Sequence, residues 1–402
     1  MNIILFDDSR HVDLKPLTYT RPIGDLRLGI LRIHEKWSRR MNATVSFLTM
    51  PYLMEKFSMK QANDNILVNA AILPNNDLCD AIGSLSSKQV LLNPDGAIVA
   101  MHIPKEMLDG VSLNLYMKLL EDMAKSLQKE VYGGQFDALH RCSDIFALNE
   151  KELQADFDLL CNGRNSADLS GDNHIRGEQF FAEEGATAYG AIFNATSGPV
   201  YLGKNSEVME GATVRGGLAL CEHATLKMGA KVYGPTTIGP HSKVGGEVNN
   251  CVIQGYSNKG HDGFIGNSVI GEWCNLGADT NTSNLKNNYG EVKTWSYRDE
   301  ALTRSGRQFV GLTMGDHSKC GINTMFNTGT TVGVFANVFG TGFPPKFIPS
   351  FAWGGQVPFE TYELNKALEV AKVVMERRSV ELSAADKNIL KEVFEQSTRY
   401  RS

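Results

Sequence analysis

Apolar side chains recur at every sixth position in the middle of the chain. The residue four positions after each of them is usually small, as at Ala212, Ala224 and Ala230, although Leu218 and Val248 are exceptions. A period of six is neither helical nor a simple alternation, and it is typical of a hexapeptide β-helix, in which three short parallel strands form one coil. The apolar positions are Leu202, Val208, Val214, Leu220, Leu226, Val232, Ile238 and Val244.

The six-residue pattern resumes downstream at Met314, Cys320, Phe326, Val332 and Val338. We therefore predict a β-helix over residues 186–356. The pattern is interrupted between Val248 and Met314, and interruptions of a solenoid are places where function is commonly found. Gly203, Gly239 and Gly245 each follow an apolar position, where a chain corner suits a residue without a Cβ atom.

The N-terminal part alternates predicted strands with predicted helices, which favours an α/β domain over residues 1–185, connector included. An apolar run at residues 3–6 ends in Asp7, Asp8, Ser9 and Arg10, so it resembles a buried strand that delivers polar residues to its carboxyl end. Further strands are predicted at 44–49, 66–68, 90–92 and 97–100, and helices at 30–40 and 113–128, with a last helix near 146–157.

Residues 357–402 show helical periodicity. Leu364, Leu368, Ala371 and Met375 share one face of a first helix. Ser383 is a candidate N-cap of a second helix, with Asp386 at its third position. The pattern leaves open whether these helices pack on a neighbouring subunit or on their own chain.

The net charge of −5 and the 21% of charged residues show no bias toward nucleic acid or a membrane surface. The seven cysteines are odd in number and scattered, which indicates reduced thiols rather than disulfides or a zinc site. The first ten residues contain aspartates and no long apolar run, so we expect neither a signal peptide nor a membrane span. We therefore expect a cytoplasmic protein.

The segment Pro16-Leu17-Thr18, followed by Arg21-Pro22, resembles the opening of sugar-nucleotide pyrophosphorylases. This resemblance implies binding of UTP or another nucleoside triphosphate, with Mg²⁺ on Asp7 or Asp8. The chain departs from that family because it lacks the glycine-rich loop, carries Ile23 in place of a lysine, and has Asn69 near the position of a metal-binding aspartate. The implied nucleotide-binding residues are Arg10, Lys15, Thr18, Arg21 and Arg27.

Residues 245–340 resemble the acetyltransferase half of the bifunctional glucosamine-1-phosphate N-acetyltransferase and N-acetylglucosamine-1-phosphate uridylyltransferase family, in its branch with a short N-terminal domain. The resemblance implies a left-handed parallel β-helix, a homotrimer and an acetyl-CoA site between coils. His261 matches the catalytic histidine, Asn284 an asparagine beside the transfer centre, and Asn275 an asparagine that contacts the amino sugar. The implied acetyl-CoA-binding residues are Ala278, Gly321, Ile322 and Gly340.

Three positions depart from this family. Phe264 and Leu285 replace tyrosines, of which the first contacts the sugar phosphate, and Asn249 replaces a phosphate-binding lysine. We still expect Phe264 to contact the substrate. Other cations must then hold the phosphate of an amino-sugar phosphate, or the substrate differs. The candidate cations in this part of the chain include Lys259, Lys286, Lys293 and Arg307.

Histidine suits the expected chemistry because it titrates near neutral pH and can take a proton from an amine that attacks a thioester. Fixed donors, such as the amide of Asn284, would stabilise the oxyanion. A zinc site is disfavoured because His241, His261 and His317 include no close pair. Two alternatives stay open: a nucleotidyltransferase whose β-helix is only a trimerisation scaffold, and a non-catalytic sugar-nucleotide-binding protein.

Overall fold

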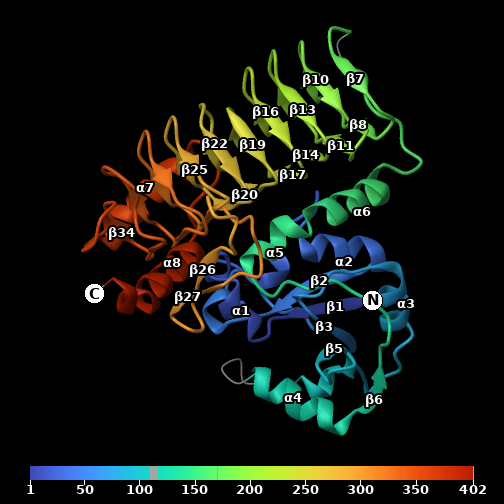
Figure 1. Cartoon of the computed structure of the whole chain (residues 1–402). Coiled ribbons are helices and arrows are strands. Elements are labelled where there is room, and N and C mark those ends of the chain that lie inside the picture. Colours follow the sequence, from blue (N-terminus) through green and yellow to red (C-terminus); the bar gives the residue numbers. More distant parts are fainter. Residues whose placement is uncertain (109–115, 170, 402) are drawn as a thin grey trace. The chain divides into compact units, whose positions relative to one another are not determined.

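The computed structural model describes residues 1–108, 116–169 and 171–401 (Figure 1). The chain divides into two compact units. The first contains residues 1–14, 20–26 and 31–141, and the second contains residues 15–19, 27–30 and 142–402. Two short stretches of the N-terminal sequence therefore belong to the second unit.

The first unit is built on a mixed sheet with the strand order β2-β1-β3-β5-β4-β6. Strands β1, β2 and β3 are parallel, and β5 runs antiparallel to both β3 and β4. Buried apolar residues on one face, among them Ile4, Leu67 and Met101, pack against Tyr116 and Leu120. The strands are β1 (Asn2–Phe6), β2 (Thr44–Leu48), β3 (Asp64–Asn69), β4 (Gln89–Leu92), β5 (Ile98–Pro104) and β6 (Gln128–Val131).

The helices of the first unit connect these strands, as the sequence pattern predicts. Helix α2 buries Ile33 and Trp37, and the side chain of Asn75 caps α3 by accepting from the N–H of Leu78. The first three residues of the helix predicted at 113–128 lie outside the described residues. The helices are α1 (Arg10–Asp13), η2 (Ile23–Asp25), α2 (Ile33–Met41), η3 (Pro51–Leu53), α3 (Asn76–Gly83), η4 (Lys105–Met107) and α4 (Tyr116–Ser126).

The second unit is dominated by a parallel β-helix with three faces. Face A consists of β7 (His174–Arg176), β10 (Ile192–Asn194), β13 (Thr213–Arg215), β16 (Lys231–Tyr233), β19 (Glu247–Asn249) and β22 (Phe264–Gly266), followed by β25 (Asn281–Thr282) and β30 (Met325–Phe326), which pair with each other. Face B consists of β8 (Phe180–Ala182), β11 (Val200–Leu202), β14 (Leu218–Leu220), β17 (Thr236–Ile238), β20 (Val252–Gly255), β23 (Val269–Glu272), β28 (Thr313–Met314), β31 (Thr331–Val332) and β33 (Phe347–Ile348). Face C consists of β9 (Thr187–Ala188), β12 (Glu207–Val208), β15 (Thr225–Leu226), β18 (Lys243–Val244), β21 (Asn258–Lys259), β24 (Asn275–Leu276), β29 (Lys319–Cys320), β32 (Asn337–Val338), β34 (Ala352–Trp353) and β35 (Glu360–Thr361).

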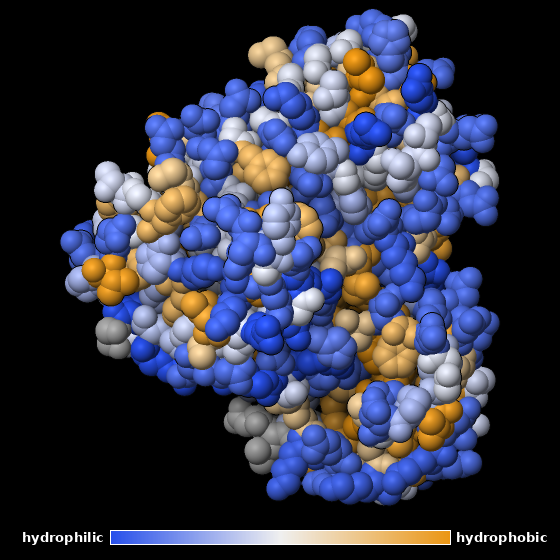
Figure 2. All heavy atoms as spheres, in the orientation of Figure 1, coloured by the Kyte–Doolittle hydropathy of each residue, from blue (hydrophilic) through white to orange (hydrophobic). Residues whose placement is uncertain are grey.

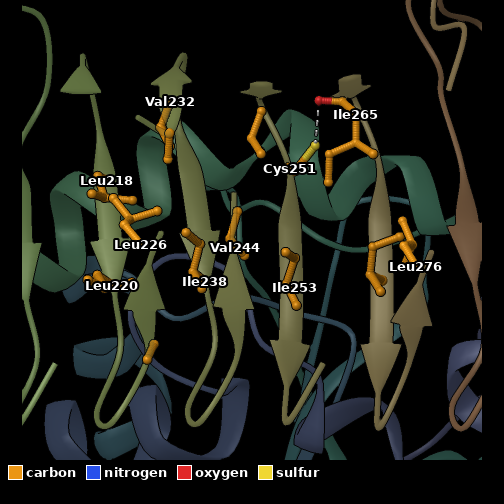
Figure 3. Close-up of a cluster of buried hydrophobic side chains, with 14 of the residues drawn as sticks. Leu218, Leu220, Leu226, Val232, Ile238, Val244, Cys251, Ile253, Ile265 and Leu276 are labelled. Carbon is orange, nitrogen blue, oxygen red and sulfur yellow. Dashed lines mark hydrogen bonds between the residues drawn. The ribbon is translucent and has the colours of Figure 1, made fainter. Parts of the chain in front are cut away.

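The period of six has a direct structural cause. Equivalent positions of successive coils pair in register, so Leu202, Leu220, Ile238 and Ile253 stack on one another inside face B. Figure 3 shows Leu220, Ile238 and Ile253 in the interior together with Val232 and Val244 from the other two faces. Burial of each such side chain contributes about 1.5–3 kcal/mol. The predicted fold class is confirmed: an α/β domain, a parallel β-helix and a short helical tail.

The interruption that the sequence pattern placed between Val248 and Met314 is shorter than predicted. Coils continue through β20 to β25, and Ile253, Ile265, Ile270 and Leu276 all lie in the core. The six-residue spacing is lost there because the inward residue Val248 follows Val244 after four residues and Ile253 follows Val248 after five. The real insertion follows β25 and carries the antiparallel hairpin β26 (Lys293–Ser296) and β27 (Ala301–Arg304).

The β-helix begins earlier than the boundary expected at residue 186, because β7 and β8 already pair with later coils. Exposed side chains in β7 hide this first coil from a pattern of apolar positions. Helices α5 (Cys142–Ala147) and α6 (Asn149–Cys161) belong to the second unit and not to the first. The Asn149 side chain explains this, since it donates to Pro235 O at 2.9 Å and accepts from Gly29 N at 2.7 Å.

The C-terminal segment forms α7 (Leu364–Glu376), α8 (Ala384–Gln396) and η5 (Thr398–Tyr400), and η1 (Leu17–Tyr19) also lies in this unit. The predicted cap is confirmed, because Ser383 Oγ accepts from Asp386 N at 3.1 Å and Asp386 Oδ2 accepts from Ser383 N at 3.1 Å. Every helix within residues 1–108, 116–169 and 171–401 is too short or too polar to cross a lipid bilayer. On the face shown in Figure 2, hydrophilic residues cover most of the surface.

Candidate functional site

A groove of about 670 Å³ runs along face C of the β-helix and contains His261. The outward positions of successive strands align there, so Lys243, Asn258, Asn275 and Lys319 form one row. His261 lies in the corner between β21 and β22, exposed to solvent. The complete lining consists of Lys227, Lys243, Tyr256, Asn258, Gly260, His261, Trp273, Cys274, Asn275, Leu276, Gly277, Ala278, Lys319, Ile322, Val374, Arg377 and Arg378.

Lys259 lies directly beneath the corner that carries His261. It pairs in register with Val244, so its side chain takes an inward position and is only 3% exposed. Its Nζ atom donates to the carbonyl oxygen of His261. The lysine that the sequence suggested for substrate binding is therefore placed inside the prism, where it fixes the backbone of the histidine.

We expect Lys259→Met to raise the free energy of unfolding at pH 7 by about 2 kcal/mol. Burial, partly offset by Asp262 and Asp279, lowers the pKa of Lys259 from 10.5 to about 8. That shift corresponds to a penalty of about 3 kcal/mol, from which about 1 kcal/mol is subtracted for the lost hydrogen bond. Between pH 8 and 10.5 the unfolded chain binds more protons than the folded chain, so the wild type gains stability as pH rises through this window.

Urea unfolding of both proteins at several pH values checks this expectation, since other titrating groups cancel in the difference between them. The advantage of the variant should shrink as pH rises from 8 to 10.5. A constant difference across that window would show that Lys259 is not the source of the penalty.

Other predicted site residues of the β-helix lie away from this groove. The Nδ2 atom of Asn284 donates to Asn267 Oδ1 at 2.8 Å, and Phe264 lies beside Gly266 on face A. Arg307 forms an ion pair with Asp144 at 2.9 Å. Lys286 donates to the carbonyl oxygen of Glu291, and Lys293 is exposed in β26. Of the predicted acetyl-CoA contacts, Gly321 follows β29 and Gly340 follows β32, and neither lines the groove.

A stack of aromatic rings runs along the corner between faces B and C. His241 stacks on Tyr256 with ring centroids 4.8 Å apart, and Tyr256 stacks on Trp273 at 4.2 Å. His317 continues the stack and is 7% exposed. Burial, followed by the neighbouring His223, lowers the pKa of His241. These contacts favour the interpretation of His241 and His317 as structural, while Tyr256 and Trp273 also form a wall of the groove.

A second pocket, of about 480 Å³, lies in the first unit at the carboxyl ends of β1 and β3. Asp8 and Asn69 meet there, with Asn69 Nδ2 donating to Asp8 Oδ2 at 2.9 Å. Burial raises the pKa of Asp8, but the hydrogen bonds and charge of Arg10, with the bond from Asn69, outweigh it and hold the pKa below its ordinary value. Lys125 and Lys129 supply cations on the same pocket.

The predicted nucleotide-binding residues are divided between the two units. Arg10 bonds to Asp8, and Arg21 is buried beside Asp25 at 3.6 Å. Arg27 belongs to the second unit, where its backbone N–H donates to Gln254 Oε1 at 2.8 Å. Lys15 and Thr18 also lie in the second unit, and burial, together with Arg399, lowers the pKa of Lys15 to about 8.

Of the two candidate metal-binding aspartates, only Asp8 has an accessible carboxylate. Asp7 is fully buried and accepts hydrogen bonds from Ile23 N at 3.0 Å and Thr49 Oγ1 at 2.5 Å, with His11 Nδ1 at 2.8 Å. The described residues contain no group of three or more His, Cys, Asp or Glu side chains that could hold a metal ion. Asp8 fits a magnesium ion that takes most of its ligands from nucleotide phosphates and water.

Sequence reasoning missed the cations of both sites. Lys243 and Lys319 could have been found, because each immediately precedes an inward apolar residue of face C and must point outward. Arg377, Arg378, Lys125 and Lys129 carry no such local signal. They reach their pockets through helix and strand packing that a single sequence does not reveal.

Comparisons with known proteins agree with the predicted resemblance. Residues 3–165 match the family described as sugar nucleotidyl transferase. A bifunctional sugar-1-phosphate nucleotidylyltransferase/acetyltransferase of Sulfurisphaera tokodaii is 34% identical over 93 residues, which is 23% of this chain and 23% of that protein. The bifunctional protein GlmU of Methanocaldococcus jannaschii is 36% identical over 89 residues, 22% of this chain and 21% of that protein.

Two further proteins show more distant similarity. The putative uncharacterized acetyltransferase YaiX of Escherichia coli is 26% identical over 143 residues, 35% of this chain and 61% of that protein. A solved UDP-N-acetylglucosamine acyltransferase of Arabidopsis shares 14% identity at a TM-score of 0.26, covering 59% of this chain and 97% of its own. The fold assigned above rests on the strand pairing of this chain alone.

The matches to the bifunctional relatives span about a fifth to a quarter of their lengths. The resemblance predicted from the sequence is nevertheless confirmed: residues 3–165 match the sugar nucleotidyl transferase family, and part of the chain is related to bifunctional sugar-1-phosphate nucleotidylyltransferase/acetyltransferases.

Proposed function

We propose that this protein transfers an acetyl group from acetyl-CoA to an amino-sugar 1-phosphate, with glucosamine 1-phosphate as the expected acceptor. One observation carries the proposal: His261 is exposed and lines a groove together with Asn275 and Ala278. His261 and Asn275 lie on neighbouring coils, which the pairing of β21 with β24 holds side by side.

The reaction follows from these groups. The imidazole of His261 accepts a proton from the amine as its nitrogen attacks the thioester carbon, and the C–S bond breaks as the C–N bond forms. The leaving thiolate of coenzyme A then takes a proton. The Asn275 side chain faces the groove and can orient the sugar, and the bond from Lys259 to the His261 carbonyl oxygen keeps the base in place.

A homotrimer is part of this proposal. Ile322, a predicted acetyl-CoA contact on the groove, is 72% exposed, and Phe339 and Phe343 are 41% and 55% exposed. Exposed apolar side chains of this size are typical of surfaces that another subunit or a ligand covers. Sedimentation equilibrium of the purified protein tests the oligomeric state.

For the first unit we propose nucleotidyl transfer from UTP or another nucleoside triphosphate to the acetylated sugar 1-phosphate. The pocket at Asp8 lies at the carboxyl ends of strands β1 and β3, which is where open α/β folds bind ligands. Lys125 and Lys129 would pair with phosphates, and Asp8 would hold Mg²⁺, which neutralises developing charge on the phosphates when it is bound.

We expect Asp8→Asn to reduce nucleotidyl transfer by about a hundredfold, because the variant loses the accessible carboxylate that follows β1 in the pocket. Pyrophosphate release from UTP in the presence of Mg²⁺ and the acceptor, N-acetylglucosamine 1-phosphate, measures the rate. Asp64→Asn is the matched control, since Asp64 starts β3 and is not part of the pocket. Equal rates for the wild type and Asp8→Asn would remove Asp8 from the mechanism.

The ion pair between Asp8 and Arg10 favours a second function for this unit, namely binding of a sugar nucleotide without turnover.

One experiment distinguishes nucleotidyl transfer from binding without turnover. The protein is incubated with glucosamine 1-phosphate, acetyl-CoA, UTP and Mg²⁺, and the products are identified by mass spectrometry. An N-acetylated sugar phosphate supports the acetyl transfer, a UDP-sugar supports the nucleotidyl transfer, and the first product without the second favours the binding function.

A further inference from the structure

Helix α7 brings two arginines to the His261 groove from the far end of the chain. Arg377 is the C-terminal cap of α7, and Arg378 follows it. The Nη2 atom of Arg378 donates to Asn258 Oδ1 at 3.3 Å, and Val374 from the last turn of the helix also lines the groove. The helical tail is therefore a wall of this groove.

The groove is strongly basic although the chain as a whole has a net charge of −5. Its cations are Lys227, Lys243, Lys319, Arg377 and Arg378, and no described lining residue is Asp or Glu. Cations that converge in one concave site without a counter-ion repel one another, which costs stability unless an anion binds among them.

The partners of these cations leave their charge uncompensated. Lys319 Nζ donates to His317 O at 3.1 Å, and the partner of Arg378 is a neutral amide. Within residues 1–108, 116–169 and 171–401, none of the five cations forms an ion pair with a carboxylate. Burial lowers the pKa of Lys319, and a bound anion would oppose that shift.

The row on face C also provides neutral donors between the cations. Asn258 and Asn275 lie between Lys243 and Lys319 in the register, and neighbouring strands are about 4.8 Å apart. Amide and ammonium donors spaced along such a row suit phosphate oxygens, and arginine offers two parallel donors to one phosphate.

We propose that the groove binds the phosphate of the ligand on which His261 acts, and that Arg377 and Arg378 make the C-terminal helical tail part of this binding site. The inference rests on the proposed acetyl transfer for the identity of the ligand. The phosphate comes from the sugar 1-phosphate or from coenzyme A, which share this chemistry.

The test is isothermal titration of three ligands, glucosamine 1-phosphate, glucosamine and coenzyme A, into the wild type and the double variant Arg377→Gln/Arg378→Gln. The matched control is Lys366→Gln/Lys372→Gln, which removes two positive charges from α7 outside the groove. We expect the arginine variant to bind at least one phosphate-bearing ligand at least tenfold more weakly, and the control to bind like the wild type. Weakened glucosamine 1-phosphate binding assigns the site to the sugar, and weakened coenzyme A binding assigns it to the acetyl donor.

The variant Arg377→Lys/Arg378→Lys separates charge from folding, because it keeps both charges and should retain most of the binding. Wild-type protein that binds no phosphate-bearing ligand, or an arginine variant that binds both within twofold of the wild type, overturns the inference. Failure of the proposed function looks different: phosphate-dependent binding would persist, but no acetyl group would be transferred.

Discussion

His261→Ala should lower kcat/KM for acetyl transfer by at least about a hundredfold. General bases typically contribute 10²- to 10⁴-fold, and the variant leaves no other imidazole among the groove-lining residues that the structure describes. The rate is measured with saturating acetyl-CoA and varied glucosamine 1-phosphate. His174→Ala is the control, because His174 is an exposed histidine in the first coil, remote in sequence and register from the groove.

The two kinetic constants distinguish a catalytic role from a structural one. A residue that only binds substrate changes KM, whereas loss of the base lowers kcat at similar KM. Circular dichroism of His261→Ala should match the wild type because the side chain is exposed and packs in no core. An unchanged kcat would mean that another group takes the proton.

Gly239→Ala should destabilise the protein by about 3 kcal/mol, because the added methyl group has no space at this corner of the β-helix. A Cβ atom at Gly239 would lie 2.1 Å from Gln254 O and 2.5 Å from Gln254 C. These are backbone atoms of the next coil, so the clash can be relieved only by separating two coils and weakening their hydrogen bonds. The midpoint of urea unfolding measures the effect.

Gly217→Ala is the matched control for this substitution. Gly217 also lies at a corner of the β-helix, but its added Cβ would meet its nearest atom at 3.6 Å, which is ordinary contact. We expect less than about 1 kcal/mol of change there. Equal losses at the two glycines would show that coil spacing does not limit the corner at Gly239.

The β-helix was predictable because its geometry repeats. Each coil places one residue such as Leu220 or Ile238 at the same inward site, so a local rule recurs often enough to be recognised. The rule failed where corners lost one or two residues and where Lys259 replaced an apolar side chain at an inward site. Both exceptions lie in the coils around His261, which places the irregular part of the solenoid beside the candidate site.

The N-terminal strands were predictable for a different reason, since short apolar runs such as Ile3–Phe6 mark buried strands. Their order and the reversed direction of β5 were not, because strand pairing depends on contacts between distant segments. The same limit explains the nucleotide-binding residues. Arg10 and Arg21 are close in sequence, but each finds a carboxylate nearby, in Asp8 and Asp25, that satisfies its charge.

The candidate acetyl-transfer site shows both sides of this limit. His261 and Asn275 were identified from the family resemblance, and one groove contains them both. Arg377 and Arg378 reach that groove only because α7 folds back on face C, and nothing in their local sequence distinguishes them from other charged residues of the tail.

The proposed acetyl transfer requires His261 to act beside an acyl donor in this groove. The direct measurement is release of free thiol when the purified wild-type protein meets acetyl-CoA and glucosamine 1-phosphate, followed with a thiol reagent and compared with the same mixture lacking the sugar. We predict sugar-dependent thiol release that continues over many turnovers. Thiol release no faster than in the mixture without sugar, from a folded protein supplied with both substrates, would contradict the account.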